Sequence, residues 1–175
     1  MNGPANTKFE IKVLKNYNEY VSRNKENAAV IYYALYDVNG DGLEELFTCD
    51  LEVSDLGDYR IYALQDGVAV EQEFRPPDFA PKLFQNGLFR CDFWGDPGTI
   101  TYYYRFEGSQ LKYQTYFWED DYDPENRIYY RDDDSSERRP IEITQQEYER
   151  QMKEIEGNGQ VVEPDWKLME DYKRE

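Results

Sequence analysis

The sequence predicts an α+β fold, in which an antiparallel β-meander of several hairpins carries an N-terminal helix and a C-terminal helix. Three observations favour this class. Asp-Gly and Asn-Gly pairs lie between apolar runs, where they promote tight hairpin turns. Other segments alternate apolar and polar residues with the period of a β-strand. Helical spacing of apolar residues and a helix-capping sequence occur near the two ends.

The N-terminal part combines one amphipathic segment with two strands. A helix is predicted within residues 8–26, because apolar side chains recur there at helical spacing with polar residues between them. The apolar positions are Ile11, Leu14, Tyr17 and Val21. Two runs rich in β-branched and aromatic residues follow, and they predict strands at 29–36 and 43–51.

Three hairpins are predicted in the middle of the chain, and a further pair of strands follows them. The hairpins join 59–65 with 68–74, 82–85 with 88–93, and 99–106 with 111–117. Residues 126–131 and 139–143 form the further pair. Arg75-Pro76-Pro77 marks a loop between the first two hairpins, because proline cannot donate to a β-ladder.

The C-terminal helix has a defined start and stop. Thr144-Gln145-Gln146-Glu147 is a capping box, in which the Thr side chain can accept from the backbone N–H three residues later. A helix is predicted from 145 to 156, and Gly157-Asn158-Gly159 ends it.

The length of 175 residues predicts one domain spanning 1–175. Residues 1–7 are expected to be an unstructured or expression-derived start, and 160–175 a C-terminal docking segment. The longest apolar stretch, Ala28–Tyr36, is far shorter than the roughly 20 residues that a membrane helix needs, so no transmembrane segment is predicted.

The charge of the chain excludes several classes of function. The net charge is −17, with 37 acidic and 20 basic residues and no histidine. Direct nucleic-acid binding through phosphate neutralisation is disfavoured, since it needs clustered Lys and Arg. Histidine-based catalytic triads and histidine zinc sites are ruled out. Aromatic residues make up 17% of the chain, which is too many for a disordered acidic protein.

One segment carries metal-binding chemistry. Residues 37–46 have the form D-x-N-x-D-G-x-x-E-L, with oxygen-bearing side chains at positions 1, 3, 5 and 9 and a glycine at position 6. The predicted ligands are Asp37, Asn39, Asp41, Glu45 and the backbone carbonyl of Leu43. An all-oxygen set favours a structural Ca²⁺ over Mg²⁺, which requires stricter octahedral geometry.

Two other interpretations of this loop exist. A standard EF-hand requires Glu at position 12, where this chain has Thr48, so that form is disfavoured. The Asn-Gly and Asp-Gly pairs can also make a plain polar turn without a metal.

The same segment resembles a known signature. Tyr33–Phe47 reads YALYDVNGDGLEELF, which is similar to the "YALYDIDGDGIPELL" sequence of uncharacterised secreted proteins and surface lipoproteins of Gram-positive bacteria. The resemblance implies calcium binding by the ligands named above and an extracellular setting, but no activity. Leu43-Glu44 replaces the usual Ile-Pro, and Asn39 replaces an Asp, which removes one charge.

Two interpretations of the cellular compartment are possible. The protein is extracellular or anchored at the cell surface if the chain is the mature portion of a secreted protein, and it is cytoplasmic if Met1 is the true start. Cys49 and Cys91 can form a disulfide in the first case or stay reduced in the second, and their spacing does not decide between them.

Other surface features suggest partners but do not identify them. The acidic stretches 119–125 and 132–137 are solvated loops or contact sites for a basic partner. Tyrosines of 102–104 and aromatic residues of 113–118 are partly core, and an exposed face of them would be a binding platform.

The predicted function is an acidic extracellular or cell-surface domain with a structural calcium loop. It serves as a binding or adhesion module for an unknown protein or glycan ligand rather than as an enzyme. The alternative is an intracellular acidic inhibitor that mimics nucleic acid toward a basic protein. A carboxylate-based glycan hydrolase is a third reading, because acids are plentiful but no pair is singled out by spacing.

Overall fold

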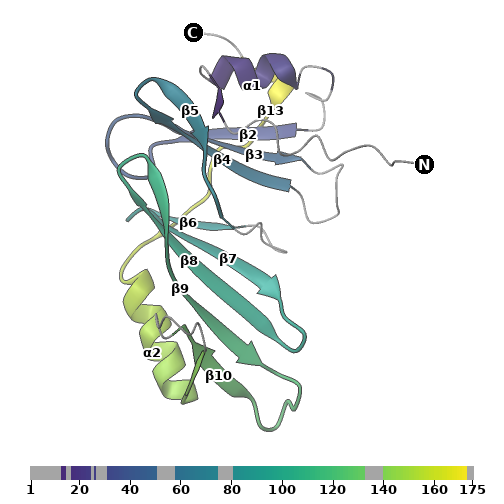
Figure 1. Ribbon diagram of the computed structural model, residues 1–175, viewed down its shortest axis with the longest axis vertical. Helices are drawn as coiled ribbons and strands as arrows, with labels where there is room; N and C mark the ends of the chain where they lie inside the picture. The colour runs from purple at the N-terminus through teal and green to yellow at the C-terminus, as the bar shows by residue number, and fades with distance from the viewer. Residues whose placement is uncertain are drawn as a thin grey trace, which may run out of the picture. The chain divides into compact units, whose positions relative to one another are not determined.

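A computed structural model describes residues 13–14, 17–24, 26, 31–50, 58–74, 81–132 and 140–172. These residues form two compact units that alternate along the chain (Figure 1). The first unit takes its described residues from Met1–Asp37, Asp41–Glu73 and Pro164–Glu175, and the second from Val38–Gly40 and Phe74–Glu163. The prediction of a single domain stays a prediction.

The first unit is built on a six-stranded antiparallel sheet with the order β1-β5-β4-β3-β2-β13. Its elements are β1 (Val13–Leu14), α1 (Tyr17–Arg23), β2 (Ile31–Tyr36), β3 (Glu45–Asp50), β4 (Asp58–Gln65), β5 (Val68–Glu71), β13 (Lys167–Leu168) and the 3₁₀ turn η3 (Met169–Asp171). Strands β2 to β5 are neighbours in chain order, as a meander requires.

One face of this sheet carries the core of the first unit. Tyr17 of α1 packs with Leu46 and Tyr62 of the sheet and with Met169 of η3, and Val21 lies against the same cluster. The two helix residues are four apart, so they lie on one face of α1. Burial of this aromatic and aliphatic cluster holds the short helix on the sheet.

The second unit contains a seven-stranded antiparallel sheet with the order β11-β10-β9-β8-β7-β6-β12. Its elements are β6 (Lys82–Phe84), β7 (Leu88–Trp94), β8 (Thr99–Glu107), β9 (Gln110–Asp120), β10 (Ile128–Arg131), β11 (Ile141–Ile143), α2 (Gln145–Glu156) and β12 (Val161–Val162). β8 and β9 are the longest strands and form its centre.

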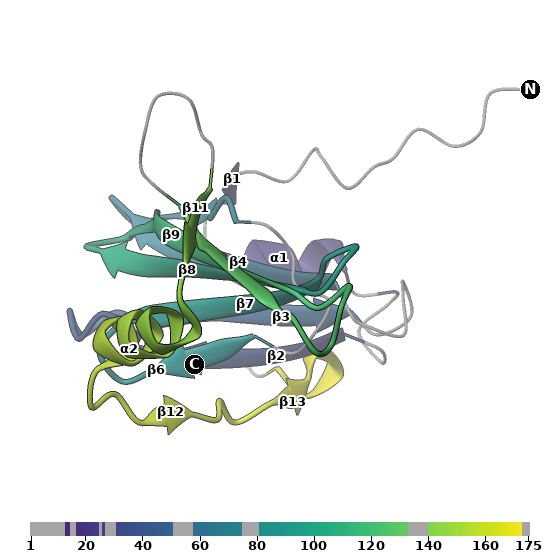
Figure 2. The same cartoon turned by 90° about the horizontal axis from the view of Figure 1, so that it is seen from below.

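Helix α2 covers one face of this second sheet (Figures 1 and 2). Tyr148, Met152 and Ile155 form a stripe at helical spacing and pack against Tyr103 and Phe117 of the sheet. Tyr148 meets Phe117 edge to face, with ring centroids 5.6 Å apart. The predicted cap is confirmed, because Thr144 Oγ1 accepts a hydrogen bond from the Glu147 N–H at 3.2 Å.

An ionic network holds the C-terminal end of α2 to the sheet. The guanidinium of Arg90 donates to Asp92 and to Glu156, each at 2.8 Å, and the hydroxyl of Tyr103 donates to the same Glu156 oxygen at 2.6 Å. Burial raises the pKa of Tyr103, and the bond to Glu156 raises it further. These groups are largely withdrawn from water, so their mutual pairing matters for stability.

The hairpin predictions are confirmed. The strands pair antiparallel across Asp66-Gly67, Asn86-Gly87 and Glu107-Gly108, and β10 pairs with β11 through Tyr129 and Ile143. The loop at Arg75-Pro76-Pro77 lies outside the described residues. Local turn chemistry and period-two alternation were sufficient to predict these pairings.

The predicted fold class is wrong. Half of the described residues (50%) are in strands and 17% are helical, so the protein is mostly β with two antiparallel sheets, not a single helix-flanked α+β meander. Within the helix expected in 8–26, the described residues are helical over Tyr17–Arg23, whereas Val13–Leu14 pairs with β5 as an edge strand. Sheet pairing thus outweighs helical spacing at these two positions. Residues 8–12 lie outside the described residues.

Both cysteines, Cys49 and Cys91, are buried, and neither is in a disulfide in the described part of the chain. The last part of the chain adds a strand to each sheet, with β12 beside β6 and β13 beside β2.

Within the described part of the chain, no helix has the length and apolar character needed to cross a membrane.

Candidate functional site

The loop predicted to bind calcium connects β2 to β3 and curls around its first acidic residue. Asp37 accepts the N–H of Asp41 at Oδ1 (3.1 Å) and the N–H of Gly42 at Oδ2 (2.9 Å). Asp41 in turn accepts the N–H of Leu43 at Oδ1 (2.8 Å). The carboxylates at positions 1 and 5 are therefore held within one short turn of backbone.

Two glycines allow this turn. Gly40 has a φ of +75° and Gly42 a φ of +87°, and a Cβ at either position would meet nothing within 4 Å. The requirement for glycine therefore comes from the backbone conformation, since an L-residue pays about 1–2 kcal/mol in the left-handed region. The sequence argument for glycine at position 6 is consistent with this geometry.

The side chain of Asn39 contacts the second unit. Its side-chain nitrogen donates to the carbonyl of Gly108 at 2.8 Å. This bond fixes the orientation of the amide through its nitrogen, whereas a cation would be bound by the amide oxygen.

Glu45 is placed differently from the other predicted ligands. It begins β3 opposite Tyr36 and is only 2% exposed. Burial raises the pKa of the nearby Tyr17 hydroxyl, and the charge of Glu45 raises it further. In the described residues, no three Asp, Glu or Cys side chains are grouped so as to hold a metal ion. Any ion in this loop therefore also needs the neutral oxygens of Asn39 and Leu43.

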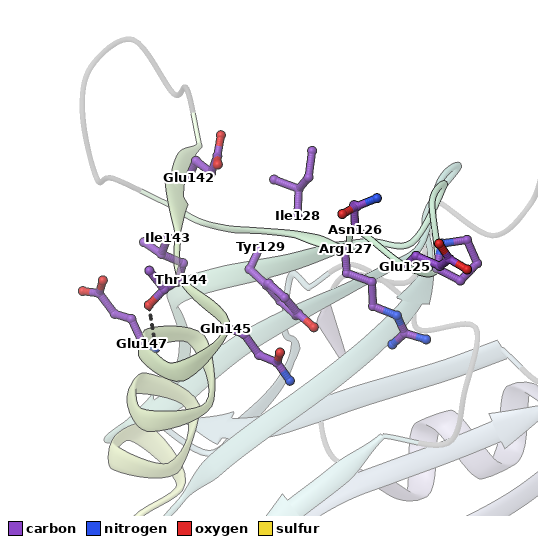
Figure 3. A pocket seen from close by; sticks show the side chains of 11 residues that line it. Glu125, Asn126, Arg127, Ile128, Tyr129, Glu142, Ile143, Thr144, Gln145 and Glu147 are labelled. Atoms are coloured by element: carbon purple, nitrogen blue, oxygen red, sulfur yellow. Dashed lines mark hydrogen bonds between the residues drawn. The ribbon is translucent and has the colours of Figure 1, made fainter.

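A polar pocket of about 800 Å³ lies in the second unit, between the start of β10 and the start of α2 (Figure 3). It forms because β10 pairs with β11, and α2 begins directly after β11. Its polar lining combines amide, hydroxyl, carboxylate and guanidinium groups from two separate segments. The main contributors are Asn126, Arg127, Tyr129, Thr144, Gln145 and Glu147.

Tyr129 is the most deeply buried of these side chains. It is 8% exposed, and its ring packs on Tyr148 with centroids 4.9 Å apart. Figure 3 shows its hydroxyl turned toward the pocket, between the side chains of Gln145 and Arg127. No hydrogen bond joins this hydroxyl to any residue that the structure describes.

The charges around the pocket are mostly negative. Arg127 forms an ion pair with Glu119, and this hydrogen bond raises the pKa of the guanidinium. Glu125, Glu142 and Glu147 also line the pocket. Glu147 accepts from Gln151 Nε2 at 2.9 Å and lies 3.9 Å from Arg150.

The aromatic residues divide between the two faces of the second sheet. Tyr103 is fully buried on the α2 side, whereas Trp118 stacks on Tyr130 on the other side with centroids 4.8 Å apart. Tyr113 is 44% exposed and donates to Asp132. The aromatic side chains on the two faces of this sheet therefore contribute mainly to packing within the second unit.

The acidic segment 119–125 ends β9 and continues as an exposed turn. Asp120 and Asp123 accept backbone N–H groups of Tyr122 and Glu125, each at 3.0 Å, and Tyr122 is 85% exposed. Of the segment 132–137, the structure describes Asp132 alone.

The sequence did not reveal the pocket at α2. Tyr129 is one of 17 tyrosines, and Arg127 belongs to no motif. The capping box was the one useful signal, because it fixes the position at which α2 starts.

Comparisons with known proteins do not identify a family for this chain. No protein-family model matches the chain, and no curated protein matches it. A solved structure described as a Xanthomonas type IV secretion system related protein is similar with a TM-score of 0.43 and 18% identity. The alignment covers 66% of this chain and 58% of that chain, so this chain spans less than two-thirds of that protein. A likeness of this degree assigns neither family nor function.

Proposed function

We propose that residues 37–45 form a structural calcium-binding loop in an extracellular or cell-surface domain that acts as a binding module. The main support is the pair of backbone hydrogen bonds from Asp41 and Gly42 to the carboxylate of Asp37. They close the turn before any ion is bound, so the ion would not have to supply the full entropic cost of ordering the loop.

The donor chemistry of the loop fits a hard cation. Asp37, Asn39 and Asp41 offer side-chain oxygens and Leu43 a carbonyl, which is the mixture that Ca²⁺ accepts. Glu45 would have to exchange its buried position beside Tyr17 for contact with the ion, so it is the weakest member of the set. A bound ion would offset the repulsion between the carboxylates and stiffen the link between β2 and β3.

The proposed compartment rests on the resemblance of Tyr33–Phe47 to loops of secreted and surface proteins. It is checked by protease treatment of intact producing cells. A surface protein is degraded under these conditions, and a cytoplasmic one is protected.

Calorimetric titration with Ca²⁺ tests the metal site directly. The wild-type protein should bind with a dissociation constant of roughly 10⁻⁴–10⁻³ M, the range of extracellular calcium modules. Asp41→Asn keeps an oxygen acceptor for the Leu43 N–H but removes one ligand charge, so the affinity should fall about tenfold or more.

Asp66→Asn is the matched control, because Asp66 also precedes a glycine in a turn between two strands. It should bind calcium like the wild type. Absence of binding by the wild type at about 10 mM Ca²⁺, well above that range, or equal binding by Asp41→Asn, would refute the proposal.

A further inference from the structure

We propose that the pocket at the start of α2 binds a neutral, hydroxyl-rich ligand, a short oligosaccharide. This inference supplies a ligand class for the proposed binding module, but it does not depend on the calcium loop, which contributes no residue to the pocket. The volume of about 800 Å³ lies within the ~300–1,000 Å³ range of small-molecule sites.

Tyr129 provides the first argument. Its ring is more than nine-tenths buried, whereas its hydroxyl oxygen lies at the accessible tip of the side chain. This hydroxyl points into the pocket and makes no hydrogen bond to the residues that the structure describes. The group is therefore held ready to donate to, and accept from, a molecule in the pocket.

The other lining groups provide both kinds of hydrogen-bonding atom. Gln145 donates its Nε2 to Glu149 at 2.9 Å, and Asn126 donates its Nδ2 to Asp123 at 2.8 Å, so each amide presents its oxygen as the remaining acceptor. Arg127 is bound to Glu119 through Nη1 and has further N–H donors on the same guanidinium. Sugar hydroxyls both donate and accept, and so suit such a mixed lining.

The charges argue against an ionic ligand. An anion would meet Glu125, Glu142 and Glu147, while the charge of Arg127 is already compensated by Glu119. A cation would meet the positive end of α2, a 12-residue helix whose first residues line the pocket. A neutral polar ligand avoids both costs.

The test uses the full chain and a panel of five neutral trisaccharides: maltotriose, cellotriose, mannotriose, xylotriose and triacetylchitotriose. Binding is measured by saturation-transfer NMR and calorimetry, with trigalacturonate as the anionic probe and deacetylated chitotriose as the cationic probe. At least one neutral trisaccharide should bind, and the two charged probes should bind more weakly than it does.

Two matched pairs of variants locate the site. Tyr129→Phe removes the hydroxyl and keeps the buried ring, and it should weaken binding about three- to tenfold. Tyr130→Phe removes the same group from the next residue, which stacks on Trp118, and should leave binding unchanged. Gln145→Ala should weaken binding to a similar degree, whereas Gln146→Ala, outside the lining, should not.

The outcomes separate this inference from the calcium proposal. Affinity for the neutral trisaccharide should be the same in calcium and in a chelator, since the pocket has no loop residue. No binding of any neutral trisaccharide at about 10 mM, above the millimolar limit of weak specific binding, would overturn the inference. So would stronger binding of a charged probe, or equal loss in Tyr130→Phe. None of these results bears on calcium titration of the loop.

Discussion

The carboxylate of Asp37 accepts a hydrogen bond from the N–H of Gly42 at 2.9 Å, five residues further along the chain. The other oxygen of the same carboxylate accepts from Asp41. The side chain thus shapes the loop even in the absence of an ion. Replacing Asp37 and replacing Asp41 should consequently have different effects on the free energy of unfolding.

Asp37→Ala should destabilise the calcium-free protein, because two backbone N–H groups lose their acceptor. A loss of about 1–2 kcal/mol is expected in the free energy of unfolding, measured by urea denaturation in a chelator. Asp41→Asn should stay within about 0.5 kcal/mol of the wild type in the same assay, because it keeps the acceptor for Leu43. Equal destabilisation by both would contradict this division of roles.

Gly98→Ala should destabilise the second unit strongly. Gly98 has a φ of +90°, and a Cβ there would lie 1.8 Å from the carbonyl oxygen of Glu119 in β9. A loss of at least about 2 kcal/mol is expected, since both the strain and the backbone clash must be relieved. Gly108→Ala is the control, because its φ is +57° but its Cβ position is open; it should cost about 1–2 kcal/mol. Gly98→Ala should therefore melt at a lower temperature than Gly108→Ala, and the reverse order would contradict the argument from the backbone clash.

Glu156→Gln should loosen the C-terminal end of α2. The change removes the charge that Arg90 and Tyr103 both contact, and about 1.5–3 kcal/mol of stability should be lost. Glu154→Gln removes a carboxylate from the same helix that pairs with Arg150 and is 61% exposed, so its effect should stay below about 0.5 kcal/mol. Similar losses in urea unfolding would show that the network contributes no more than a surface ion pair.

Alkaline pH should destabilise the second unit through Tyr148. Burial raises the pKa of its hydroxyl from 10.0 to about 12. The raised value means that the folded state favours the protonated form. The stabilisation is therefore complete below pH 10 and is lost as the pH rises through about 12.

Stability measured between pH 9 and 12 should fall less steeply in Tyr148→Phe than in the wild type. Tyr122→Phe changes a tyrosine that is 85% exposed and should follow the wild-type curve. Parallel curves for all three proteins would mean that Tyr148 does not contribute to the alkaline loss.

The sequence predicted the hairpins well because their signals are local. Asp66-Gly67 and Asn86-Gly87 carry the turn conformation themselves, and alternation in β8 and β9 fixes which side chains share a face. The helix start at Thr144 was predictable for the same reason. The fold class was not predictable, because Val13–Leu14 joins the sheet through pairing with β5, a partner more than fifty residues away.

The calcium loop and the pocket at α2 also differ in how far they could be predicted from the sequence. The loop 37–45 could be read from spacing because its residues are consecutive, although the burial of Glu45 depends on strand pairing that spacing does not show. Tyr129 and Gln145 come together only after β10 pairs with β11 and α2 turns back across the sheet. No short motif encodes that arrangement.

The most direct measurement of the central claim is the melting temperature as a function of Ca²⁺ concentration. Binding to the folded state should raise it by about 3–10 °C at calcium concentrations of roughly 10–100 times the dissociation constant. The rise should persist in Asp66→Asn and be abolished or strongly reduced in Asp41→Asn. A melting temperature that does not change with calcium in the wild type, or that rises equally in Asp41→Asn, would contradict the calcium loop.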